Sequence, residues 1–162
     1  MIDSAKISTG LQFIADYLQQ AMIQELLSQG HKATGELIQS VKNEVRQSTK
    51  GWQIVGKSLF YGVYVDRGRP AGLKKVPISA LINWIIARRF ESDKKKIRSM
   101  AFAVQYNIWK KGIKQPDKLG WITNTLKENE SKIKMDVERL FSDVIKLGIA
   151  NMVRMTNTQL AK

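Results

Sequence analysis

The fold of this chain is decided by residues 34–65, which read TGELIQSVKNEVRQSTKGWQIVGKSLFYGVYV. Helical spacing gives way here to the weak alternation that is typical of a strand. A Lys-Gly turn signal follows at residues 50–51, and Trp52 and Ile54 then fall on one face of a second strand. The pattern predicts a β-hairpin, preceded by a helical turn over residues 34–40.

The aromatic stretch 59–65 closes this region. Its aromatic and β-branched residues predict either a third strand or a short aromatic helix packed on the sheet. Residues 66–72 contain two glycines and a proline, which predicts a loop. The rings of Phe60, Tyr61 and Tyr64 could stack on nucleic-acid bases, although packing in the core is the expected role.

Helices are predicted on both sides of the hairpin. Before it, apolar residues recur at three and four positions over residues 8–28, and Gly30 ends this amphipathic helix. After it, Pro77 starts a strongly apolar helix, which we expect to be largely buried, and a second helix is predicted over residues 97–111. Residues 131–155 predict the longest amphipathic helix of the chain.

These elements predict an α+β fold with a long N-terminal helix, a small antiparallel β-sheet or hairpin, two central helices and a long C-terminal helix. A chain of 162 residues, 43% of them hydrophobic, can bury a core without disulfides. No repeat or long linker divides the sequence, so we expect a single domain over residues 1–162.

The positive charge of the chain is unevenly distributed. The net charge is +13, and residues 57–115 alone hold 14 basic and three acidic residues. A concentrated positive field favours a polyanion, which could be nucleic acid, an anionic membrane or the acidic face of another protein. Charge alone does not choose among these partners, and a solvated basic surface that keeps the protein soluble is a further alternative.

Residues for catalysis or metal binding are scarce. The sequence has no cysteine and one histidine, His31, in the turn after the first helix. This inventory excludes disulfides, thiolate zinc sites and Cys–His chemistry, and no HExxH, GxSxG or GxGxxG pattern occurs. We therefore expect no enzyme activity, no cofactor and no metal site. Without a signal-sequence pattern or an apolar run of membrane-spanning length, we expect a soluble protein made in the cytoplasm.

Two groups of basic residues are candidates for contacts with a partner. The first flanks the glycine-rich loop beside the aromatic stretch, where a scaffold presents a mobile basic tip, and comprises Arg67, Arg69, Lys74 and Lys75. The second lies in a polar break between the two central helices, where lysines could reach phosphates, although a solvated connection is the commoner role. It comprises Lys94, Lys95, Lys96 and Arg98.

The order of these segments resembles a known family. The segments are TGELIQSV at 34–41, WQIVG at 52–56, YGVYVDRGRP at 61–70, VPISALINWI at 76–85 and AFAVQYNIWKKGIKQP at 101–116. Their succession resembles the tail-component family of tailed bacteriophages, which comprises tail-completion and head-to-tail joining (neck) proteins. The resemblance covers residues 34–116, and its most specific element is 61–69, an aromatic-rich segment that ends in an acid, one further residue and a glycine.

The resemblance implies a structural subunit that forms a ring in the neck, or at the head-proximal end of the tail, and joins the portal or connector to the tail. The implied partners are further copies of the chain, the portal or connector, and the tail-tube or tail-terminator proteins, with non-specific contact to packaged DNA and none to a membrane. The implied location is the virion, with the host cytoplasm during assembly. The helix over 131–155 would be an extension that grips an adjacent ring.

On this basis we expect nine basic residues to contact a partner or to line the DNA channel. They are Arg67, Arg69, Lys74, Lys75, Arg88, Arg89, Lys94, Lys95 and Lys96. The alternative function is a cytoplasmic basic nucleic-acid-binding module that uses the same region.

Overall fold

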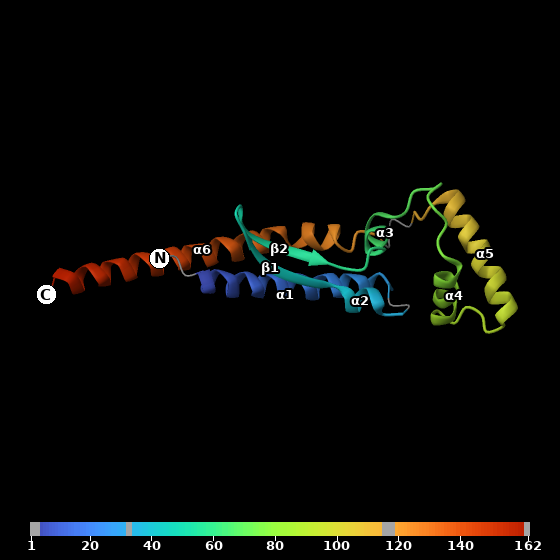
Figure 1. Cartoon of the computed structure of the whole chain (residues 1–162), viewed down its shortest axis with the longest axis horizontal. Coiled ribbons are helices and arrows are strands. Elements are labelled where there is room, and N and C mark those ends of the chain that lie inside the picture. Colours follow the sequence, from blue (N-terminus) through green and yellow to red (C-terminus); the bar gives the residue numbers. More distant parts are fainter. Residues whose placement is uncertain (1–3, 32–33, 115–118, 161–162) are drawn as a thin grey trace. The chain divides into compact units, whose positions relative to one another are not determined.

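The computed structural model describes residues 4–31, 34–114 and 119–160, with side chains up to residue 154 (Figure 1). These residues form six helices and two strands in the order α1 (Ser4–Ser28), α2 (Glu36–Ser40), β1 (Lys42–Ser48), β2 (Gly51–Lys57), α3 (Gly62–Arg67), α4 (Ile78–Ala87), α5 (Lys94–Lys111) and α6 (Thr123–Leu160). The strands pair as one antiparallel hairpin. The predicted α+β fold, with its long terminal helices, is therefore confirmed.

The chain divides into two compact units. Unit 1 comprises Met1–Ala21, Lys42–Gly56 and Leu126–Lys162, and unit 2 comprises Met22–Val41 and Lys57–Thr125. Unit 1 holds 11 basic and eight acidic residues, whereas unit 2 holds 16 and six. Most of the net positive charge therefore belongs to unit 2.

The core of unit 1 lies between α1, α6 and the hairpin. The buried side chains are Ile7, Leu11, Ile14 and Leu18 of α1 and Val144 of α6, with Val45, Trp52, Ile54, Ile133, Val137 and Leu140 packed against them. The α1 residues are spaced at three and four, so they form one apolar stripe. A Cβ atom at Gly10 would overlap the Leu140 side chain, so glycine allows α1 and α6 to approach closely here.

A polar contact joins the hairpin to α1 in the same unit. Asn43 of β1 is buried, and its side-chain amide donates a hydrogen bond of 3.1 Å to the Ala15 carbonyl. Its backbone amide donates one of 3.0 Å to Gln19 Oε1. Burial of Asn43 is therefore compensated by hydrogen bonds, which also fix the hairpin on the helix.

Unit 2 has two apolar clusters. The first contains Met22, Leu26, Leu37, Val41 and Trp121. The second lies between α4 and α5 and contains Leu81, Ile85, Ile97 and Ala101. Each cluster is small for its unit, so single core residues should matter for its stability.

Several predicted elements differ from the observed ones. Residues 62–67 form helix α3, which settles the choice between strand and helix left open by the sequence. Helix α6 begins at Thr123, eight residues before the predicted start, and Leu160 is its last residue. The expectation that the helix after Pro77 is largely buried was wrong, because in α4 only Leu81 and Ile85 are buried. The family-like stretch ends at Pro116, which lies outside the described residues.

Within the described ranges, no helix combines the length and the apolar character that a bilayer crossing requires.

The α4–α5 cluster offers a matched test of burial. Ile85 is 0% exposed, and its neighbour Ile86 is 52% exposed. We expect Ile85→Ala to lower the free energy of unfolding by about 2–5 kcal/mol, because it leaves a cavity among packed side chains. Ile86→Ala should change it by only about 0.5 kcal/mol. Urea denaturation followed by circular dichroism measures both, and equal effects would contradict the described packing.

Candidate functional site

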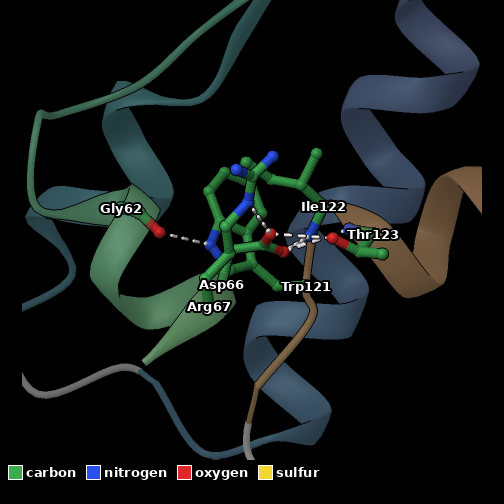
Figure 2. Close-up of polar contacts among 6 residues, drawn as sticks. All are labelled: Gly62, Asp66, Arg67, Trp121, Ile122 and Thr123. Atoms are coloured by element: carbon green, nitrogen blue, oxygen red, sulfur yellow. Dashed lines mark hydrogen bonds and ion pairs between the residues drawn. The ribbon is translucent and has the colours of Figure 1, made fainter. Parts of the chain in front are cut away.

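Residues 61–69, the most specific element of the family resemblance, are joined by hydrogen bonds to residues 120–123 around Asp66 (Figure 2). We call this region the structural joint. Asp66 Oδ1 accepts hydrogen bonds from the backbone amides of Ile122 (2.7 Å) and Thr123 (3.0 Å), and Oδ2 accepts one from the Thr123 hydroxyl (2.8 Å). Amides at a helix start have no partner within the helix, and negative charge is favourable there. Asp66 therefore acts as a helix cap for α6, supplied from a distant part of the sequence.

Trp121 completes this joint. Its side chain is almost fully buried, and its indole Nε1 donates a hydrogen bond of 2.9 Å to the Gly62 carbonyl (Figure 2). A Cβ atom at Gly62 would lie 2.8 Å from Ser58 Oγ and 3.1 Å from Leu37 Cδ1, so the close packing requires glycine. Gly68 has a φ of 77°, and a Cβ there would crowd the Ile113 carbonyl. The two glycines and the acid of the segment therefore have structural roles.

Arg69 does not belong to the contact residues. It is 8% exposed, donates a hydrogen bond to the Lys74 carbonyl, and lies over the Tyr64 ring at 5.6 Å. Its backbone pairs with Ile113 in an isolated antiparallel bridge. The expectation that Arg69 contacts a partner is therefore corrected: its guanidinium holds together the segments around it within unit 2.

The other eight predicted residues are exposed and lie in unit 2. Arg67 is within 3.7 Å of Asp66, but its side chain is largely in solvent. Lys74 and Lys75 follow the Gly68 segment, and the Lys75 ammonium lies 5.6 Å from the Trp109 ring of α5. The structure thus brings Lys75 and α5 together. Contact of these residues with a partner stays a prediction.

Arg88 and Arg89 end helix α4. The Arg88 guanidinium donates a hydrogen bond of 2.6 Å to the Gly30 carbonyl. The amides of Arg89 and Phe90 donate to the carbonyls of Ile86 and Ile85, which is the hydrogen-bond pattern of a Schellman cap. Arg89 has a φ of 54° at the position where glycine is usual. A long cationic side chain therefore occupies a strained backbone position.

Lys94, Lys95 and Lys96 form the first turn of α5 and do not lie in a flexible break, as the sequence suggested. Asp93 caps this turn and accepts a 2.9 Å hydrogen bond from the Lys96 amide. Cations in a first turn are unfavourable, because the helix dipole is positive at that end. The lysine triplet is thus held in place despite an electrostatic cost.

The exposed face of α5 was not recognised from the sequence. Phe102 and Tyr106 lie on it, with Arg98 5.9 Å from the Phe102 ring and Lys110 5.7 Å from the Tyr106 ring. Their spacing of four was the available signal, since residues four apart share a helix face. The face lies opposite the buried residues Ile97 and Ala101 and the partly buried Val104 and Ile108.

Acidic residues are almost absent from this region. Between Gly68 and Lys114 the sequence has 12 basic residues, and its acids are Glu91 and Asp93. Glu91 Oε1 accepts hydrogen bonds from the amides of Ser92 and Asp93. The bond from Asp93 and then that from Ser92 lower the pKa of Glu91, so its carboxylate stays ionised. Both acids bind nearby backbone amides, which leaves the cations in large excess.

A sequence pattern typical of phosphate-binding loops lies on strand β2, and the structure shows whether it can have that role. Residues 51–58, GWQIVGKS, match GxxxxGK[ST], the pattern of phosphate-binding P-loops. That function needs a loop between a strand and a helix that starts at the Lys-Ser pair. Here Gly51–Lys57 form strand β2 itself, and the next helix begins at Gly62. We therefore assign the pattern no nucleotide-binding role.

In the portion of the chain that the structure covers, no three His, Asp or Glu side chains come together as a metal site. Comparisons of the sequence with protein-family models and with curated proteins, and of the structure with solved structures, gave no match.

Substitution of Asp66 tests the joint. Asp66→Ala removes the acceptor for two amides and one hydroxyl, so we expect a loss of about 2–3 kcal/mol in the free energy of unfolding. Asp93→Ala removes an exposed cap of α5 and should cost only about 1 kcal/mol. Urea denaturation compares the two variants. A smaller effect at Asp66 than at Asp93 would contradict its role as the central cap.

Arg88 and Arg89 give a second matched pair. Arg89→Gly should raise the free energy of unfolding by about 1 kcal/mol, because glycine removes the left-handed backbone strain. Arg88→Gly should lower it, since Arg88 has a right-handed conformation and donates to Gly30. Thermal melting distinguishes the opposite signs, and a loss of stability in Arg89→Gly would contradict the strain.

Proposed function

We propose that this protein is a structural virion subunit of a tailed bacteriophage, which forms a ring in the neck or at the head-proximal end of the tail and joins the portal or connector to the tail. The resemblance over residues 34–116 supports the bacteriophage assignment. Support for assembly into a ring comes from one structural observation, an apolar ridge on α6. The proposal includes no catalytic step.

The ridge consists of Phe141, Ile145, Ile149 and Val153, at intervals of four residues. All four are exposed, the last three more than half. They are distinct from the α6 residues Ile133, Val137, Leu140 and Val144, which pack in the core of unit 1. Helix α6 thus has two apolar stripes, and unit 1 covers one of them. A second stripe is typical of a helix that packs against a further element.

Earlier on α6, the partly buried core residues Ile133 and Val137 also border an open surface. An open, shallow hollow there is lined by the apolar residues Leu126, Ile133 and Val137 and by the charged residues Lys127, Glu130, Lys134 and Glu138. Charges of both signs alternate around it, so a neighbouring polar surface could pair with them. Helix α6 thus exposes apolar side chains at this hollow and at the ridge, which favours contact with another protein chain.

The distribution of charge favours unit 1 as the contact between copies. With 11 basic and eight acidic residues, unit 1 is close to neutral, whereas like charges would oppose contact between copies of unit 2. Burial of each ridge side chain contributes about 1.5–3 kcal/mol when complete. The free energy gained at a single interface between two subunits is therefore modest, because association costs about 4–15 kcal/mol. A closed ring, in which every subunit makes two contacts, overcomes this limit.

The ridge gives a direct test of assembly. Ile149→Lys places a charge in the ridge and should abolish oligomers, whereas Ala150→Lys changes an exposed neighbour about 100° around the helix and should not. Light scattering during size-exclusion chromatography measures the mass, negative-stain microscopy detects rings, and circular dichroism checks the fold. A wild-type protein that stays monomeric at high concentration would refute ring formation.

The bacteriophage role needs a separate experiment. Deletion of the gene from the phage should give DNA-filled heads and separate tails that do not join. Supplying the wild-type gene in trans should restore infectious particles, and the Ile149→Lys gene should not. Normal, fully tailed particles from the deletion strain would contradict the proposal.

A further inference from the structure

We propose that the exposed face of α5 binds a single strand of DNA, with its lysines and arginines against phosphates and with bases stacked on aromatic rings. This inference does not rest on the proposed ring. It concerns a surface within unit 2, and the ridge belongs to unit 1.

Helix α5 is strongly basic. Helix α5 has six basic residues and no acidic one: Lys94, Lys95, Lys96 and Arg98 near its start, and Lys110 and Lys111 at its end. The two groups are separated by 12 or more residues, or at least about 18 Å along the axis. No ion pair engages any of these six cations in the portion of the chain with placed side chains. At 100° per residue, Lys95, Arg98 and Lys110 lie on the same side of α5 as Phe102 and Tyr106, so the phosphates of a strand along this side could reach them.

Aromatic rings are exposed on the same helix. Phe102, Tyr106 and Trp109 are 48%, 50% and 38% exposed. Each has a cation close to its ring, namely Arg98, Lys110 and Lys75 at 5.9, 5.7 and 5.6 Å. A base stacked on such a ring would carry its phosphate toward the neighbouring cation. Rings interleaved with cations are typical of surfaces that bind single strands.

The composition of this face differs from that of a protein interface. Its centre is lined by small or polar side chains, Ser99 and Ala103, with Lys95 and Lys110 beyond them. Lysine, serine and alanine are depleted at the centre of protein interfaces relative to the rest of the surface. The apolar ridge of α6 contains none of these three residue types, whereas the α5 face carries all of them.

The spacing of the rings favours an unpaired strand over a duplex. The centroids of Tyr106 and Trp109 are 6.1 Å apart, and the rings are tilted by 40°. Stacked bases in a B-form strand follow one another every 3.4 Å or so. Successive bases could therefore stack on successive rings only when the strand is stretched. In a duplex the bases are stacked on one another inside the helix and do not reach the rings.

The test is fluorescence anisotropy with labelled oligo(dT) of about 16 nucleotides, the upper end of common site sizes. We expect binding that weakens with salt and that exceeds binding to a duplex of the same length. Phe102→Leu and Tyr106→Leu should each weaken binding by about fivefold or more, since stacking on one ring contributes about 1–3 kcal/mol. Leucine keeps the face apolar, so a merely hydrophobic contact would change little.

The cations are tested by the salt dependence. Lys95→Gln with Lys110→Gln should reduce the slope of log K against log salt by about 1.4, which is about 0.7 per lost phosphate contact. The matched control, Lys127→Gln with Lys134→Gln on α6, removes the same charge from unit 1 and should leave the slope unchanged. Circular dichroism and thermal melting check that every variant is folded.

Three results would overturn the inference: duplex bound as tightly as oligo(dT), ring variants that bind like the wild type, or no binding to oligo(dT) at low salt. Duplex binding without a contribution from the rings would indicate a purely electrostatic surface. Capture of an acidic protein in place of DNA would indicate a protein interface. The Ile149→Lys variant should bind oligo(dT) like the wild type, so failure of this inference and failure of ring assembly can be told apart.

Discussion

The fold of unit 2 depends on one buried carboxylate. Asp66 is almost completely enclosed, and its oxygens accept from Ile122 and Thr123, so a residue of α3 determines where α6 begins. The Gly120 amide also donates to the Asp66 carbonyl, at 2.6 Å. A buried carboxylate is unfavourable unless it accepts hydrogen bonds. We therefore expect the hydrogen bonds of Asp66 to form together when this region folds. Gly62 and Trp121 are constrained by the same packing.

This constraint explains which parts of the fold could be predicted from sequence. Local patterns were sufficient for α1, for the hairpin and for the turn before it, because period, turn residues and apolar stripes are contained in each segment. They were not sufficient at residues 59–65, where aromatic and β-branched residues suit either a strand or a helix. The start of α6 was also placed too late. In both cases the deciding contacts join Gly62 and Asp66 to residues 121–123, more than 50 positions along the chain.

The candidate surfaces were predicted only in part for a related reason. The excess of cations in the middle of the chain is a property of composition, and the sequence located it correctly. Burial is a property of the fold, and it removes Arg69 from the surface because its partners, Lys74 and Ile113, come together only in unit 2. Conversely, Phe102 and Tyr106 are exposed, because the α4–α5 cluster is completed by smaller side chains on the opposite face of α5.

Some cations of unit 2 lower the stability of the fold, which ordinary solvated lysines do not. Arg89 has a left-handed backbone where glycine would be unstrained, and Lys94–Lys96 oppose the dipole of α5. Neither feature improves packing, because these side chains are exposed. Positions that break a local rule without a structural gain are expected at functional sites. A surface needed only for solubility could place its charges anywhere, so the positions of these cations favour a specific polyanionic partner over the solvated alternative.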